Sequence, residues 1–232
     1  MLRKRLFVFD AQKRPQELII RNYNREDFAM LIDIQRECFP PPFPPELWWK
    51  EEQLENHIRL FPEGAICAEI GGRLVGSMTA LIVSFDSAEP GHLVHTWAEM
   101  TDNGYIGNHD PNGNTLYIVD ISVRPDSRKL GIGKWMMHTM CELAVHLGLS
   151  RLLGGARMSG YHRYADRMSP EDYARAVVAG EIDDPVITFL LRCGRTPVAV
   201  VPGYLEDEES LNHALLMEWT NPFAGSSPLG NY

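Results

Sequence analysis

The clearest change of hydrophobic period along the chain lies between residues 116 and 148. Residues 116–123 form a nearly continuous apolar run, rich in β-branched and aromatic side chains, which predicts a largely buried strand. Pro125 has no N–H to donate, so we expect the strand to end before it. From Gly133 onward apolar residues return every three to four positions until Gly148, a typical C-terminal cap. The pattern predicts a strand, a glycine-containing loop and an amphipathic helix.

Similar patterns predict elements on both sides of this unit. Strands are expected at 18–23, 65–70, 74–83, 151–156, 198–201 and 214–219, and a glycine turn joins the second to the third. Helices are expected after the N-cap residue Asn24, at 46–60, from Ser169 to Gly180 and at 186–193. The proline-rich segment 39–45 favours a stiff loop between two helices, with a polyproline ligand for an SH3-type partner as the alternative.

Length and composition predict one sizeable domain. The 232 residues are 44% hydrophobic and 23% charged, and neither an internal repeat nor a second core is visible. We expect an N-terminal arm at 1–16, a domain at 17–220 and a tail or linker at 221–232. The net charge of −9 argues against a nucleic-acid surface and is compatible with a cationic small substrate.

Cysteine usage and hydropathy bear on the compartment. The four cysteines are scattered without a Cys-x-x-Cys pair, which favours reduced core thiols: Cys38, Cys67, Cys141 and Cys193. No apolar run approaches the length of a membrane span, and the apolar segment near the N-terminus is too short for a secretory signal. We therefore expect a cytoplasmic protein with no membrane partner.

The loop at 128–134 has the composition of a phosphate-binding loop. A helix N-terminus presents free backbone N–H groups, and glycines let an anion approach them closely. A Walker A loop fails here because Arg128 and Trp135 stand where Gly and Ser or Thr are required. A dinucleotide-binding loop fails because Met136 replaces the third glycine.

These residues resemble the signature of the GNAT acyl-CoA N-acyltransferase superfamily, Arg/Gln-x-x-Gly-x-Gly/Ala after a strand that ends Val-x-Pro. Arg128, Gly131 and Gly133 match the loop, and Val123 and Pro125 match the strand end. The resemblance covers residues 17 to 219. It implies a single α/β (α+β) domain with a mixed, twisted seven-stranded sheet, helices on both faces, and a central strand pair that splays apart around the thioester.

The resemblance implies acetyl-CoA as co-substrate and a primary amine, on a small molecule or a peptide, as acceptor. The central strand should pair with the pantetheine arm and the loop should hold the pyrophosphate, through Ile121, Ser122, Val123, Arg128, Lys129, Leu130, Gly131, Ile132, Gly133 and Lys134. The proline-rich loop and a late acidic loop would border the acceptor. Their candidates are Phe43, Trp48, Trp49, Glu206 and Asp207, although any of these can equally be core or solvated surface.

One departure from the superfamily concerns the proton donor for the departing thiolate. Many relatives carry a tyrosine in the helix before the sixth strand, and here Leu190 occupies its place. Tyr161 and Tyr164 are the nearest substitutes in sequence. For the base, Asp120 on the central strand is the first candidate, with a buried acid bonded to neighbouring backbone as the alternative, and Glu99 is the second candidate.

Two further readings remain open. His92, His95 and Glu99, in a long polar insertion at 85–114, could be pictured as metal ligands, but their spacing fits no strong metal motif, so no metal is expected. Because the tyrosine is missing, a non-catalytic acyl-CoA-binding module, which senses CoA or supports a partner domain, is the alternative function.

The chain also resembles the acyltransferase module fused to a nitrilase-type amidohydrolase domain in some bacteria, and a homodimer is possible.

Overall fold

The computed structural model describes residues 2–225, so the last part of the expected tail, 226–232, lies outside the described residues. The strands are β1 (Arg3–Phe9), β2 (Pro15–Asn22), β3 (Ala65–Ile70), β4 (Arg73–Val83), β5 (Thr115–Val123), β6 (Arg151–Arg157), β7 (Thr196–Val201) and β8 (Ala214–Thr220). They form one sheet in the order β1-β2-β3-β4-β5-β6-β8-β7. All neighbours are antiparallel except β5 and β6, which makes the sheet mixed.

The helices lie between the strands along the chain. They are α1 (Phe28–Cys38), α2 (Glu51–Leu60), α3 (Pro90–Leu93), α4 (Trp97–Thr101), α5 (Ile132–His146), α6 (Pro170–Val178) and α7 (Ile187–Arg192). Single turns of 3₁₀ helix span Arg25–Asp27, Pro45–Leu47, Pro62–Gly64, Pro125–Ser127 and Tyr161–Arg163. Among the described residues, no helix combines the length and hydropathy that a bilayer crossing requires.

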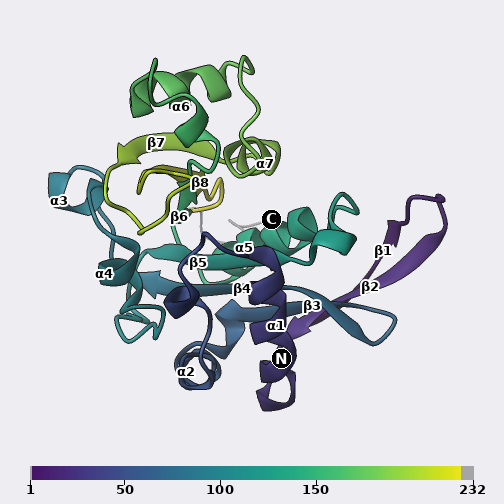
Figure 1. Cartoon of the computed structure of the whole chain (residues 1–232). Helices are drawn as coiled ribbons and strands as arrows, with labels where there is room; N and C mark the ends of the chain where they lie inside the picture. The colour runs from purple at the N-terminus through teal and green to yellow at the C-terminus, as the bar shows by residue number, and fades with distance from the viewer. Residues whose placement is uncertain (1, 226–232) are drawn as a thin grey trace, which may run out of the picture.

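The expected count of seven strands is wrong, because residues 3–9 of the expected arm form an eighth strand. β1 pairs with β2 over seven registered positions, and Figure 1 shows this hairpin reaching out from the body of the molecule. Exposure alternates along this strand, with Lys4, Leu6 and Val8 on the less exposed face, and Val8 packs into the core. Asp10 closes the turn by accepting bonds from the N–H groups of Gln12 and Arg14 at 2.9 Å each. The basic composition concealed a period-two strand.

Helices cover both faces of the sheet. A Cβ added to Gly76 of β4 would lie 3.1 Å from Met136 of α5, so that face carries α5. Thr79, three positions along β4 and on the other face, shares a hydrogen bond of 3.1 Å with Tyr23, which also bonds to His57 of α2. The core therefore lies in two layers, one on each side of the strands.

The insertion at 85–114 is not the polar surface excursion that its composition suggested. It contains α3 and α4, and it buries Trp97, Thr101 and Ile106. The Trp97 Nε1 donates to the Val119 carbonyl of β5 at 3.0 Å, and the Trp97 N–H donates to the Tyr204 carbonyl at 2.7 Å. These bonds tie the insertion to the central strand and to the loop between β7 and β8.

Candidate active site

The loop before α5 has the conformation that an anion site needs. Gly131 has φ +82° and caps the helix in the left-handed region, and Lys129 before it has φ +68°. Nothing lies within 4 Å of the place where a Cβ of Gly131 would stand. The helix starts at Ile132, so helical geometry leaves the first-turn amides without partners inside the helix. Free amides, the positive end of the helix dipole and an open approach fit a pyrophosphate.

The second glycine of the loop is needed for packing. A Cβ on Gly133 would stand 3.1 Å and 3.2 Å from two ring atoms of Phe189 in α7. Glycine therefore lets α7 lie against the first turn of α5, beside the expected phosphate site. A branched side chain at this position would push the two helices apart.

The sheet has a gap between β5, which leads into this loop, and its neighbour β6. β5 and β6 are paired only from Thr115 to Tyr117, opposite Arg151 to Leu153. Beyond Tyr117 and Leu153 the two strands have no registered pairs, although both continue to Val123 and Arg157. This confirms the expected splayed pair. The gap exposes backbone groups that a continuous sheet would have used.

Alternation along β5 identifies those backbone groups. The Arg124 N–H donates to the Val75 carbonyl of β4 at 2.9 Å, so the peptide groups of Ile121 and Val123 face the opposite way, toward the gap. In this structure the Val123 carbonyl accepts from the Arg128 Nε at 3.1 Å and from the Cys38 Sγ at 3.2 Å. The N–H groups of these residues and the Ile121 carbonyl therefore fit an extended pantetheine arm.

A cavity of ≈ 160 Å³ fills the gap. That volume holds on the order of ten water-sized groups, enough for an acyl group and a small acceptor. Its wall is mainly apolar and aromatic, with few polar side chains, and Leu190 is part of it. The lining includes Phe43, Trp49, Trp97, Asp120, Gly154, Gly155, Arg157, Phe189, Leu190, Arg195 and Tyr204.

Asp120 is the carboxylate on this wall. A bulge in the β4–β5 ladder, between Thr79 and Ala80, places Asp120 opposite Thr79 on the face that carries α1 and α2. The Ser122 Oγ donates to the Asp120 Oδ2 at 3.0 Å. Burial raises the pKa of Asp120 to about 7, although the bond from Ser122 acts in the opposite direction. A carboxyl group with this pKa can accept and release a proton near neutral pH.

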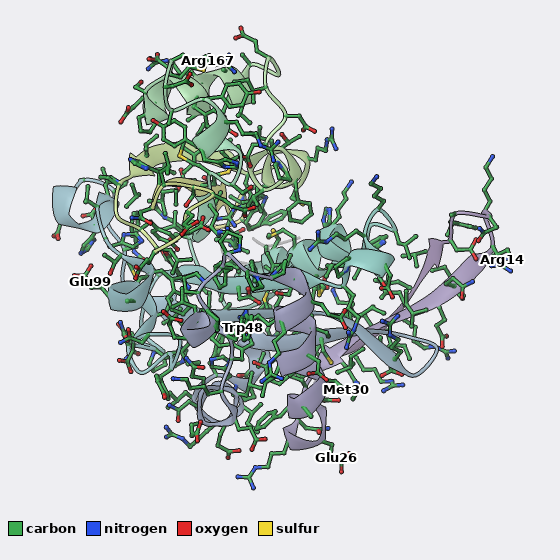
Figure 2. The ribbon with its side chains drawn as sticks, in the orientation of Figure 1. Arg14, Glu26, Met30, Trp48, Glu99 and Arg167 are labelled. Atoms are coloured by element: carbon green, nitrogen blue, oxygen red, sulfur yellow. The ribbon has the colours of Figure 1, made fainter. Side chains whose placement is uncertain are left out.

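The other three predicted catalytic residues lie away from the cavity wall. Tyr161 is buried and donates to the Met168 carbonyl at 3.1 Å, and Tyr164 packs on Tyr173 with ring centroids 5.4 Å apart. Glu99 belongs to α4 and is exposed, at the edge of the molecule in Figure 2. Its carboxylate accepts from the Thr96 N–H at 2.9 Å, closing a capping box. These contacts give the three side chains structural tasks.

Among the described residues that line the cavity, Tyr204 is the only one with a hydroxyl group. Its ring lies on Gly155, where a Cβ would stand only 2.3 Å from the ring. The Tyr204 hydroxyl shares a hydrogen bond of 2.8 Å with Tyr117, and Tyr117 shares one of 2.9 Å with the His95 Nε2. No sequence motif joins these three residues, because they come from a loop, the central strand and the insertion.

The directions of the bonds in this chain follow from its far end. The His95 Nδ1 lies 2.9 Å from the His92 carbonyl, which can only accept, so Nδ1 carries the proton. The neutral Nε2 then accepts from Tyr117, and Tyr117 in turn accepts from Tyr204. Burial lowers the pKa of His95, which agrees with a neutral ring. Burial raises the pKa of Tyr204 to about 12. Tyr204 therefore keeps its proton at neutral pH and is a hydrogen-bond donor.

The predicted acceptor-binding residues divide into two groups. Phe43 lines the cavity, and the Arg157 guanidinium lies over its ring at 5.1 Å. Trp48 does not line it and donates to the Phe39 carbonyl at 3.0 Å, whereas the neighbouring Trp49 does line it. Of the two neighbouring tryptophans that the sequence offered as pocket walls, Trp49 lines the cavity and Trp48 does not.

The acidic loop has both a buried and an open carboxylate. Asp207 is 2% exposed and pairs with Arg157, so it cannot bind an acceptor amine directly. That pairing holds the pKa of Asp207 below its usual range against the opposing effect of burial. Glu206 lines a second hollow beside the cavity, together with Glu46 and Lys50.

The side chains that could suggest a metal site are engaged in other contacts. Both ring nitrogens of His95 have protein partners, and Glu99 caps a helix. Within residues 2–225, no group of three or more His, Cys, Asp or Glu side chains has the arrangement of a metal site. The four cysteines are free thiols.

An anion loop at a helix N-terminus, a parallel strand pair that splays beyond it, and a mainly apolar cavity in the gap define an acyl-CoA-binding transferase fold. The model of the acetyltransferase (GNAT) family matches residues 28–168, more than half of the chain. The chain belongs to this family, and it is an acyltransferase that takes acetyl groups from acetyl-CoA.

Two curated relatives come from Bacillus subtilis. An "uncharacterized N-acetyltransferase", YkwB, is 58% identical over 220 residues, which are 95% of this chain and 96% of the relative. A "probable hydrolase", YhcX, is 38% identical over 213 residues. That match covers 91% of this chain but only 40% of YhcX, so the chain corresponds to one part of a longer protein there.

Solved structures share the fold at low sequence identity. The loading GNATL domain of CurA from Lyngbya majuscula has a TM-score of 0.70 at 18% identity, covering 88% of this chain and 98% of that domain. The GphF GNAT-like decarboxylase, solved with isobutyryl-CoA, has a TM-score of 0.69 at 21% identity, covering 87% and 98%. The protein yncA from Salmonella typhimurium, described as a "putative acetyltransferase" and solved with acetyl-CoA, has a TM-score of 0.54 at 13% identity, covering 92% and 99%.

Proposed function

We propose that the protein transfers the acetyl group of acetyl-CoA to a primary amine of a small molecule or peptide. The single observation that carries this proposal is Asp120. Its carboxyl group lies on the cavity wall between the splayed strands and has a pKa raised to about 7. An acyl-CoA-binding module without catalysis has no need of a base at this place.

Asp120 acts as the general base. An alkylamine with a pKa near that of lysine, about 10.4, is mostly protonated at neutral pH, and only its neutral form attacks a thioester. The nitrogen becomes much more acidic as the N–C bond forms, and the Asp120 carboxylate takes the proton that it loses. Ser122 orients the carboxylate through its hydrogen bond.

Tyr204 takes the part that the missing tyrosine at Leu190 plays in many relatives. Its hydroxyl stays protonated, so it stabilises the negative charge that develops on the departing sulfur by a hydrogen bond. Rotation about the C–O bond turns the proton from Tyr117 toward the gap. The loss of that one hydrogen bond costs about 1 kcal/mol.

The acceptor enters from the face that carries α1 and α2. Phe43, Trp49 and Trp97 form an aromatic wall on this side of the cavity. Glu206, in the neighbouring hollow, supplies a negative charge that attracts a cationic amine. Asp207 acts indirectly, by holding Arg157 over the aromatic ring of Phe43.

Thiol release tests the proposed function. The purified protein is mixed with acetyl-CoA and a panel of pooled amines and peptides, and free CoA is measured with a thiol reagent. We expect release above the rate of acetyl-CoA alone for at least one pool, and we expect Asp120→Asn to abolish that excess. An acetyl-CoA-dependent rise in melting temperature without amine-dependent release from any pool would favour the non-catalytic binding module.

A further inference from the structure

Arg195 is a buried cation without a counter-ion. It lies between α7 and β7, is 3% exposed, and lines the cavity between the splayed strands. Within the described residues, no carboxylate lies within ion-pairing distance of its guanidinium. Burial lowers the pKa of Arg195 to about 10, which still leaves it charged at neutral pH. A charge in this position is costly unless something pairs with it.

The guanidinium has donors without hydrogen-bond partners. Its Nη2 donates to the Met217 carbonyl, whereas its Nε is buried with no hydrogen-bond partner among the described residues. The hydrogen bonds found within residues 2–225 include none from Nη1. A buried guanidinium with partnerless donors and no counter-ion stabilises an anionic group in the cavity that it lines, and a carboxylate accepts charge-assisted N–H bonds.

The position of Arg195 relative to the gap identifies which substrate carries the carboxylate. A Cβ on Gly154 would stand 3.6 Å from the Arg195 Nη2 and 3.2 Å from the Ile118 carbonyl, so the guanidinium lies where β5 and β6 begin to separate. A Cβ on Gly155 would point to the opposite face, into Tyr204. Arg195 therefore lies on the α5 and α7 side, whereas Asp120 and Phe43 lie on the acceptor side.

The expected path of the acyl donor leads toward Arg195. The pyrophosphate site at 129–134 lies at one end of the gap, and the pantetheine arm follows Val123 and Ile121 toward the thioester. The acyl group beyond the thioester continues toward Ile118 and Gly154, where the strands meet. We propose that the protein also accepts acyl-CoA donors whose acyl group ends in a carboxylate, and that Arg195 binds this carboxylate. This inference rests on the acyl transfer proposed above.

Calorimetric binding to the intact protein tests the inference with matched donor pairs. Malonyl-CoA is compared with isovaleryl-CoA, and succinyl-CoA with 4-methylpentanoyl-CoA. In each pair an isopropyl group replaces the carboxylate at nearly the same shape. Two lengths are used so that one carboxylate reaches the guanidinium. We expect the carboxylated donor of at least one pair to bind about tenfold more tightly, because its carboxylate accepts a charge-assisted hydrogen bond that the isopropyl group cannot.

Three variants identify the source of any preference. Arg195→Met, of similar length and without charge, should remove the preference while acetyl-CoA still binds. Arg195→Lys, which keeps a cation, should retain part of it and serves if the methionine variant does not fold. Arg192→Met removes an exposed arginine at the end of α7 and should change neither member of a pair.

Equal affinities within both donor pairs would overturn the inference, and so would a preference that survives in Arg195→Met. If Arg195 instead binds a carboxylate of the acceptor, the two donors of each pair should bind with equal affinity. The KM for carboxylated amines should then rise in Arg195→Met. If no CoA thioester binds at all, acetyl-CoA included, it is the proposed acyl transfer that fails. The two failures are therefore distinguishable.

Discussion

Replacing Asp120 by asparagine should remove activity and, at alkaline pH, stabilise the fold. Burial raises the pKa of Asp120 from 3.8 to about 7, so its folded form holds a proton more strongly than its unfolded form. Stability then falls as the pH rises from about 4 to about 7, because the unfolded chain releases this proton first. Asparagine has nearly the same shape, can still accept the bond from Ser122, and never ionises.

The size of the effect follows from the shift. A difference of about three pKa units at about 1.4 kcal/mol each gives about 4 kcal/mol as an upper figure. Asp120 is partly exposed to the cavity, where water reduces this cost, so we expect Asp120→Asn to stabilise the fold by about 1–3 kcal/mol at pH 8. At pH 4 the folded carboxyl group is uncharged and the unfolded one only partly ionised, so the difference should be small.

Two assays check the prediction. Urea unfolding at pH 4, 6 and 8 measures the free energy of unfolding of wild type and variant, and Ser122→Ala serves as a control that keeps the carboxylate. Turnover should fall about 10²-fold or more in Asp120→Asn with unchanged acetyl-CoA affinity. The acidic limb of the wild-type pH–rate profile should be absent from the profile of the variant. A variant that is less stable than wild type at pH 8, or that turns over normally, would refute the reasoning.

Three other variants test the loop, the hydroxyl and the acidic loop. Gly131→Val, at the open position of the loop, should fold but lose the stabilisation of about 2.7 kcal/mol expected at acetyl-CoA concentrations about 100 times Kd; an unchanged thermal shift would remove the loop from the site. Tyr204→Phe should lower kcat by about tenfold or more with little change in KM, whereas Tyr161→Phe should not, and equal rates in both would show that Tyr204 is only structural. Asp207→Asn should cost about 2 kcal/mol in urea unfolding at pH 7, because it leaves a half-buried arginine short of a partner, and exposed Glu208→Gln should cost nothing measurable. Since the pKa of Asp207 is lowered, its contribution exists at neutral pH and should disappear as the pH falls through that pKa.

Much of the fold could be predicted because its signals are local. Asn24 and Ser169 were predicted as helix caps, and both side chains accept from backbone N–H groups two or three residues ahead. The change of period at Gly133 and the glycine at Gly148 placed α5 nearly correctly. The β1 strand was missed because its pairing with β2, rather than its composition, stabilises it.

The candidate site could be predicted only where one segment supplies it. The loop at 128–134 and Asp120 belong to one strand-loop-helix unit, and both lie where the motif predicted. Tyr204 and Arg195 gave no signal, since a tyrosine in a loop and an arginine before a strand are ordinary. Proximity in sequence also suggested Tyr161, whereas the cavity is lined by residues far apart in the chain.

The sequence by itself determined the secondary structure around the central strand, the conformation of the anion loop and the class of co-substrate. These depend on φ preferences, hydrogen-bonding capacity and hydrophobic period, which act over a few residues. Only the tertiary structure decided which side chains share the cavity, which carboxylate is half-buried enough to titrate near neutrality, and which arginine lacks a counter-ion. Burial and desolvation depend on packing between distant segments, here β5, β6, α7 and the insertion, and so the chemistry of the site follows from their assembly.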